Sequence, residues 1–218
     1  MTRRALLTLA LLAGIAPGAT AQIIHAPVVR TRPEAWASLG IGWMQQQGFC
    51  DRQTSDCWDF GSGPQWRASL ELPLGFGGTT YGIVGTIAKM PLVYSGSALG
   101  SNTCLSCDAD ANVSQILGTL RMGGSSGFHQ VIDLDAGVTM FSNFRRTDTG
   151  EKLGTGKTTS NFTFALAYGF GYGFSPRAQM FITQGYALQI LPRQPGNPNN
   201  YAQQTTLRIG GRYGLGGR

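Results

Sequence analysis

The chain has 218 residues, of which 32 are glycine, and charged residues make up only 13% of it. Globular proteins average roughly 7% glycine and about 25% charged residues, so this composition argues against a disordered tail, a nucleic-acid-binding protein and a charged coiled coil. The hydrophobic share of 42% is ordinary. Beyond the N-terminal segment no apolar run reaches the ~18 residues of a membrane helix. The balance favours short strands over helices.

Residues 1–21 have the layout of a secretory signal peptide. Arg3 and Arg4 form a basic start, Ala5–Ala16 is apolar, and Ala19–Ala21 has the small residues of a cleavage site. We expect cleavage before Gln22, with an uncleaved signal anchor as the alternative. Without its two N-terminal arginines the formal charge falls from +6 to +4, too small an excess to indicate nucleic-acid binding.

Residues 22–33 are expected to form a short periplasmic lead, followed by a single domain at 34–218 in which apolar and small or polar residues alternate. The alternation is clearest in Asn161–Phe174, where large apolar side chains occupy every even position and small ones the odd positions. On a strand those large side chains share one face, whereas on a helix they scatter. Eight segments follow this rhythm: Ala35–Met44, Trp66–Phe76, Thr79–Met90, Val113–Met122, Phe128–Phe144, Asn161–Phe174, Arg177–Leu191 and Thr205–Leu215. Lys89 and Gln184 fall on the apolar face, so each lies near an interface or marks a bulge.

The connections between these segments alternate in length. Tight turns are expected at Gly77-Gly78, Gly123–Gly127 and Ser175-Pro176. Long loops at one end and short turns at the other are typical of an all-β, eight-stranded antiparallel up-and-down transmembrane β-barrel. The long loops are expected at Gln45–Pro64, Ser95–Asp110, Arg146–Ser160 and Pro192–Gln203.

The apolar face of each strand is expected to contact lipid. An eight-stranded barrel has an interior only just wide enough for side chains, so rows of aromatic rings fit outside and the small residues fit inside. Facing outward, Trp43, Trp66, Phe76 and Tyr213 would lie at the membrane interfaces. The alternative is a soluble calycin-type barrel, which would bury the apolar face.

The end of the last strand carries a motif. Gly210, Tyr213 and Leu215 fit the pattern polar, any, Gly, any, any, aromatic, any, hydrophobic within Arg208–Leu215. This resembles the β-signal of bacterial outer-membrane proteins, although the chain continues to Arg218 instead of ending in an aromatic residue. The layout as a whole resembles the small eight-stranded OmpA/OmpX-type barrels. The resemblance implies a bacterial outer-membrane location, with outer-membrane lipid and the assembly machinery as partners.

Strand parity also predicts what fills the lumen. Four bases and three acids point inward, where they can satisfy one another by charge-assisted hydrogen bonds. Opposing small residues leave room for them, so a filled polar core is expected instead of an open pore; a catalytic or proton-conducting role for Asp133 or Asp135 is the alternative. The predicted lumen residues are Arg67, Glu71, Arg121, His129, Asp133, Asp135, Arg208 and Arg212.

All four cysteines lie in the two longest loops. In an exported chain this predicts disulfides, and we favour the local pairs Cys50–Cys57 and Cys104–Cys107 over cross-loop pairing. Cys104 and Cys107 also have the spacing of zinc ligands, but Cys50 and Cys57 do not, and oxidising conditions compete against thiolates. We therefore expect no metal site and no cofactor.

The sequence favours a structural or surface-interaction protein that offers four extracellular loops to an unknown partner. The main enzymatic alternative is a lipid A deacylase or palmitoyltransferase barrel, and a narrow channel is the third possibility. A general base acting on outer-leaflet lipid belongs near the long loops. His129 follows a short turn at the opposite end, so we expect it to hydrogen-bond in the lumen.

Overall fold

The computed structural model describes residues 32–51, 56–75, 78–95, 106–153, 159–191 and 201–216. The predicted signal peptide lies outside the described residues, as does nearly all of the predicted lead at 22–33. No helix in the described ranges is long and apolar enough to cross a membrane. The strands are β1 (Ala35–Gln46), β2 (Phe49–Asp51), β3 (Asp56–Phe60), β4 (Ser62–Pro73), β5 (Thr80–Ser95), β6 (Cys107–Gly123), β7 (Gly127–Arg146), β8 (Thr159–Ser175), β9 (Ala178–Ile190) and β10 (Tyr201–Leu215).

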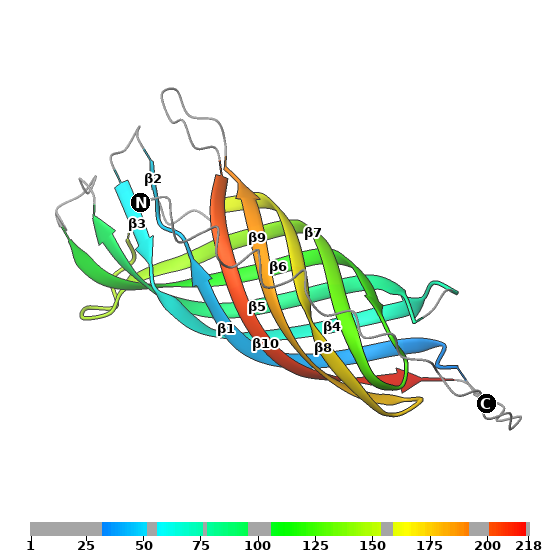
Figure 1. The fold of residues 1–218 in the computed structure, drawn as a ribbon. Coiled ribbons are helices and arrows are strands. Elements are labelled where there is room, and N and C mark those ends of the chain that lie inside the picture. Colours follow the sequence, from blue (N-terminus) through cyan, green and yellow to red (C-terminus); the bar gives the residue numbers. More distant parts are fainter. Residues whose placement is uncertain are drawn as a thin grey trace, which may run out of the picture. The chain divides into compact units, whose positions relative to one another are not determined.

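Eight long strands close into an antiparallel barrel (Figure 1). Around the wall, β1 pairs with both β4 and β10, and the β5–β6 pairing completes the ring. Closure gives the backbone of each wall strand a partner on both sides, which is the condition for placing strands in hydrocarbon. The predicted eight-stranded all-β barrel is therefore confirmed.

The short connections lie at one end of this barrel. β6 ends at Gly123 and β7 starts at Gly127, while β8 and β9 are joined through Pro176. The turn before β5 requires a glycine, because Gly78 has φ 89° and an added Cβ would lie 2.2 Å from the carbonyl oxygen of Gly123. Figure 1 shows β2 and β3 at the opposite end from the C-terminal end of β10.

The expectation of a loop over Gln45–Pro64 is wrong. This stretch contains β2 and β3, which pair with each other, and β4 already begins at Ser62. β3 also pairs with β5, bringing Phe60 opposite Leu92. The hairpin forms because Phe49, Trp58 and Phe60 pack on an apolar cluster inside the barrel, although its strands are too short to show a clear alternation.

β5 and β6 also extend beyond the predicted segments. The polarity of the two faces inverts on β6 opposite Lys89, and on β5 the outward face changes only in part, since Val93 stays apolar and exposed. Before Lys89 in the sequence, the outward residues of β5 are apolar, with Ile83 and Ile87 60% or more exposed. After Lys89, the inward residues of β5 are apolar, and Met90 and Tyr94 are buried. Lys89 points outward and its Nζ lies 2.7 Å from the carboxylate of Asp110. This inversion marks the edge of the lipid-facing surface.

Gln184 is paired on both sides without a register shift, so the bulge explanation is wrong for it. Lys89 pairs continuously with β6, but on its other side four residues, 61–64, lie opposite residues 89–91 of β5, so an irregularity does lie beside Lys89. A bulge does occur between β6 and β7, where the register shifts between Asp110 and Asn112. It is associated with Asn143, which has φ 56°. The extra residue in β7 leaves the side chain of Asn143 exposed.

A belt of large apolar side chains surrounds the outside of the barrel. Leu39 is 73% exposed and Leu70 is 66% exposed. Among the residues predicted for the membrane interfaces, Trp43, Trp66 and Tyr213 are all exposed, whereas Phe76 lies outside the described residues. The outer surface is therefore apolar while the interior carries charge, the reverse of a soluble barrel.

Candidate functional site: the polar lumen

Charged side chains from β4, β6, β7 and β10 meet inside the barrel. Strand alternation sends them inward, and none is more than 7% exposed. A buried charge is tolerated only when it is paired and hydrogen-bonded, so the partners of each one matter. The set comprises Arg67, Glu71, Arg121, Asp133, Asp135, Arg208 and Arg212.

Glu71 connects several of these groups toward the short-turn end. Its carboxylate accepts hydrogen bonds from Ser69 Oγ and Thr80 Oγ1, both at 2.6 Å. The guanidiniums of Arg121 and Arg212 approach it at 3.5 and 3.6 Å. Four donor groups therefore converge on one buried carboxylate.

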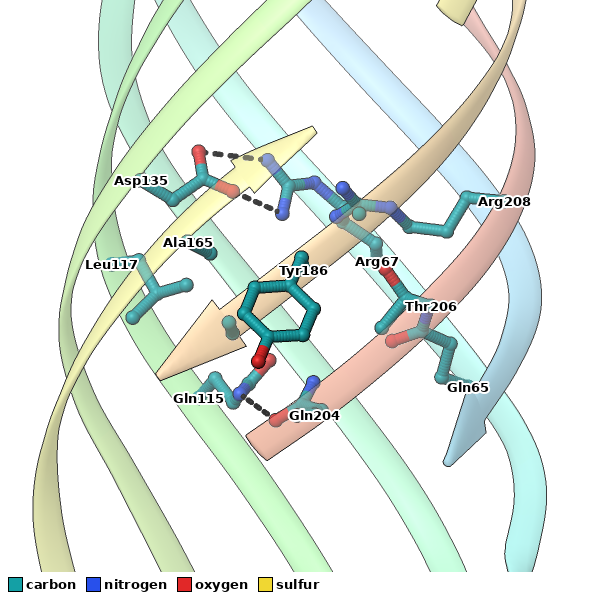
Figure 2. A pocket seen from close by; sticks show the side chains of 12 residues that line it. Gln65, Arg67, Gln115, Leu117, Asp135, Ala165, Tyr186, Gln204, Thr206 and Arg208 are labelled. Atoms are coloured by element: carbon teal, nitrogen blue, oxygen red, sulfur yellow. Dashed lines mark hydrogen bonds and ion pairs between the residues drawn. The ribbon is translucent and has the colours of Figure 1, made fainter. Parts of the chain in front are cut away.

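Two aspartates of β7 are each held by a guanidinium in bidentate geometry. Arg121 donates from Nε and Nη2 to Asp133 at 2.7 and 2.9 Å. Arg67 donates from Nη1 and Nη2 to Asp135 at 2.9 and 3.2 Å, as Figure 2 shows. Parallel double hydrogen bonds fix the orientation of both partners. Arg121 and Asp133 face each other on the neighbouring strands β6 and β7, whereas the Arg67–Asp135 pair links β4 to β7 across the lumen.

Two aromatic rings complete this cluster, and the sequence reasoning missed both. The Arg121 guanidinium lies 4.4 Å from the ring centroid of Phe181, and that of Arg212 lies 4.4 Å from the ring centroid of Trp36. Arg212 also donates from Nε to Gln179 at 2.7 Å. Ring faces attract cations, so these rings stabilise charge within the lumen. Both rings occupy inward positions in the alternation of their strands, and this alternation could have identified them from the sequence.

Small residues give Arg208 its space. An added Cβ at Gly42 would lie 2.8 Å from Arg208 Cγ, and one at Gly185 would lie 3.1 Å from Arg208 Nη2. The long side chain therefore lies over positions that lack a side chain. Within the described residues Arg208 has no ion pair, and its Nε has no hydrogen-bond partner.

A layer of amides lies next to the charged cluster, toward the long-loop end. Gln115 donates to Thr139 Oγ1 at 2.9 Å and to Gln204 Oε1 at 3.0 Å. Gln189 donates to Gln46 and Gln204, both at 2.9 Å. Sequence reasoning missed this layer because it concentrated on charged groups, although the inward parity of these glutamines was visible.

Beyond the amides the interior is apolar. Met44, Met90 and Phe141 are fully buried there, and Phe49 and Phe60 contact Phe141 through their rings. The rest of this apolar cluster comprises Ala88, Leu92, Tyr94, Ala109, Ala111, Val113 and Leu153, with Trp58, Cys107 and Phe144 packed against it. Three successive layers therefore fill the interior: charged, amide and apolar.

His129 lies apart from the ion pairs. Its Nδ1 is 2.9 Å from the carbonyl oxygen of Gly127, and its ring packs against the positions of Gly124 and Gly171. It is half-buried at the short-turn end. Among the described residues no group of His, Cys, Asp or Glu side chains has the arrangement of a metal site.

The first predicted disulfide joins the β2–β3 hairpin. Cys50 and Cys57 are directly opposite each other, with a Cα–Cα distance of 4.0 Å. Cys107 is also disulfide-bonded, while its predicted partner Cys104 lies outside the described residues. The described part of the chain contains no free cysteine.

Replacing both Cys50 and Cys57 by serine should destabilise the hairpin while leaving the barrel folded. The disulfide closes only a short loop, and the eight wall strands do not depend on it. We expect faster proteolysis between β2 and β3, with no change in the heat-dependent gel mobility of the barrel. Loss of folded barrel in the double variant would contradict this view.

The residues of the proposed assembly signal lie at the end of the last wall strand. Tyr213 and Leu215 point outward, and Gly210 faces inward, where an added Cβ would lie 2.6 Å from the Phe181 ring. The aromatic and aliphatic positions are therefore accessible from outside the barrel. Recognition by the assembly machinery stays a prediction.

Comparisons with known proteins support the fold. No protein-family model and no curated protein matches the sequence. The structure is similar to Neisserial surface protein A, with a TM-score of 0.51 and 12% identity over 84% of this chain and 97% of that one. This chain has the fold of a small outer-membrane barrel.

Two further solved structures are similar at lower scores. OprG from Pseudomonas aeruginosa has a TM-score of 0.44 and 16% identity, covering 85% of this chain and 98% of that one. Ail of Yersinia pestis has a TM-score of 0.40 and 14% identity, covering 83% and 98%. The resemblance inferred from strand layout is thus confirmed at the level of fold by the likeness to Neisserial surface protein A.

Proposed function

We propose that this chain is an integral outer-membrane barrel whose sealed lumen supports a surface-interaction role outside the cell. The observation that carries the proposal is the three-layered filling of the lumen. Charged, amide and apolar layers follow one another along the axis. Such an interior suits a rigid support better than a passage for solutes.

The outer surface supports the membrane location. Outward side chains at the centre of the belt, such as Leu39 and Leu70, are large, apolar and exposed. Exposure of this much contiguous apolar surface to water would be costly, whereas hydrocarbon accepts it. Outer-membrane lipid is therefore the first partner of the protein.

The part beyond the polarity inversion supports the interaction role. β7 has 20 residues and β6 has 17, whereas ~9–11 tilted residues cross a bilayer. The excess carries the barrel past the lipid surface, where the β2–β3 hairpin packs on the apolar cluster. A groove of about 620 Å³ there is lined by Phe49, Trp58, Asp59 and Tyr201 among others. Asp59 and Tyr201 are exposed at this groove, while Phe49 and Trp58 also pack on the apolar cluster.

Binding to intact cells tests this role. In the hairpin-less variant, Phe49–Phe60 is replaced by Asn-Gly. Cells that display the wild type should bind added macromolecules that cells displaying this variant do not bind. A matched control replaces Ser125 by alanine in the short turn at the opposite end. Equal binding by all three would overturn the surface-interaction role. Assays with labelled lipid A or phospholipid on refolded protein test the enzymatic alternative.

The wild-type barrel should show no steady, large conductance in planar bilayers. Because three layers are stacked, Glu71→Ala alone is expected to leave the lumen closed, since the amide and apolar layers remain. Lys89→Ala, on the outer surface, serves as the control. A steady large conductance from the wild type would contradict the sealed lumen and favour the channel alternative.

A further inference from the structure

Arg208 leaves the charged layer with one unmatched positive charge. Asp133 is taken by Arg121, and Asp135 by Arg67. The third carboxylate, Glu71, lies between Arg121 and Arg212. Arg208 is only 7% exposed, and its Nε has no hydrogen-bond partner in the described lumen. An isolated buried charge is costly, so a counter-charge beside this guanidinium would stabilise the lumen.

A small cavity of about 20 Å³ lies beside Arg208. Figure 2 shows Arg208 extending from β10 toward Arg67, whose guanidinium holds the carboxylate of Asp135. The cavity is also lined by Gln65, Gln115 and Gln204. It therefore lies where the charged layer meets the amide layer.

Two fully buried N–H donors of the residues that line this cavity have no hydrogen-bond partner among the described residues. Among its lining side chains, the atoms without a partner are Arg208 Nε and Gln65 Nε2. Two acceptors of the lining are already engaged, because the Asp135 carboxylate accepts from Arg67, and Gln204 Oε1 accepts from Gln115 and Gln189. A guest here lies among side chains that carry two unused N–H groups and one unpaired positive charge.

We infer that this cavity is a binding site for a small monovalent anion, with chloride as its natural occupant. A cavity of about 10–15 Å³ is enough to hold one water molecule. The cavity beside Arg208 therefore has room for one monatomic guest but not for sulfate, phosphate or a carboxylate. In a low-dielectric interior an anion gains more than a water molecule from an unpaired guanidinium. The anion completes the charge balance of the lumen.

Bromide locates the site directly, because it replaces chloride and scatters X-rays anomalously. Crystals of the refolded barrel grown in sodium bromide should show an anomalous peak beside Arg208 Nε and Gln65 Nε2. In detergent solution, replacing gluconate by chloride at constant ionic strength should raise Tm by about 2–4 °C.

Arg208→Met is expected to fold, because each carboxylate keeps a guanidinium partner, and to lose both the bromide peak and the chloride effect. Gln65→Leu should weaken both. Arg145→Met removes an exposed charge outside the lumen and should retain both. Absence of the peak, with only water in the cavity, would overturn the site. So would a chloride effect that survives in Arg208→Met, or a peak without any chloride effect in solution, meaning binding at crystal concentration only.

Discussion

Replacing Arg121 by methionine is expected to lower the free energy of unfolding by about 3–5 kcal/mol, the cost of removing one partner from a buried ion pair. Arg121 holds Asp133 by two hydrogen bonds and also approaches Glu71. Methionine fills similar space, but it leaves the carboxylate of Asp133 buried without its donor. Urea titration of the barrel in lipid vesicles, followed by tryptophan fluorescence, measures the loss.

Two variants test whether the loss comes from the uncompensated charge. Adding Asp133→Asn to Arg121→Met should recover part of the stability, because the double variant buries one charge fewer and neighbouring sites are not additive. Arg146→Met removes a guanidinium that holds the pKa of Asp148 below its usual value by donating a hydrogen bond to it. That pair is exposed, so stability should not change measurably. Equal losses in Arg121→Met and Arg146→Met would refute the proposed importance of the lumen pairs.

Arginine at Leu70 is expected to cost about 2–4 kcal/mol, as charged residues do on the lipid face near the bilayer midplane. Leu70 lies on β4 at the centre of an outward apolar row that runs from Trp66 to Leu74. The guanidinium would have to enter hydrocarbon or distort the membrane. The same urea titration, together with the yield of folding into vesicles, measures the effect.

The matched control for Leu70→Arg is Asn112→Arg on β6. Asn112 also points outward, but it lies opposite Lys89 at the polarity inversion. There the cost should fall to about 0–1 kcal/mol, as expected near an interface. If both substitutions cost the same, the belt does not face hydrocarbon and the inversion does not mark its edge.

The wall of the barrel could be predicted from sequence because one physical requirement governs it. In a strand that separates lipid from a narrow lumen, every second residue must be apolar, and Asn161–Phe174 shows this rule with little interference. The charges predicted to face inward were identified by the same parity. Their individual partners were not, since pairing depends on the stagger of the strands and on side-chain reach across the lumen.

The rule stops working where the strands leave the lipid. Beyond Lys89 the inside becomes an ordinary core, so the buried Met90 and Tyr94 are large and apolar, whereas the buried Thr80 and Thr86 at the other end of β5 are polar. Read with a single parity, this reversal looked like the end of the strand. The β2–β3 hairpin was not predicted either, because it is held in place by the tertiary packing of Phe49 and Phe60 and not by a regular alternation in its sequence.

The clamped hairpin also makes the barrel a natural display scaffold. A foreign peptide inserted between Asp51 and Asp56 would start and end next to the Cys50–Cys57 bond, whose Cα atoms are 4.0 Å apart. The insert would thus be presented as a closed loop whose two ends are already fixed before an antibody binds. Since β3 pairs only with Leu92–Ser95 of β5, beyond the lipid-facing part of that strand, an engineer could vary such epitopes without redesigning the membrane-embedded part.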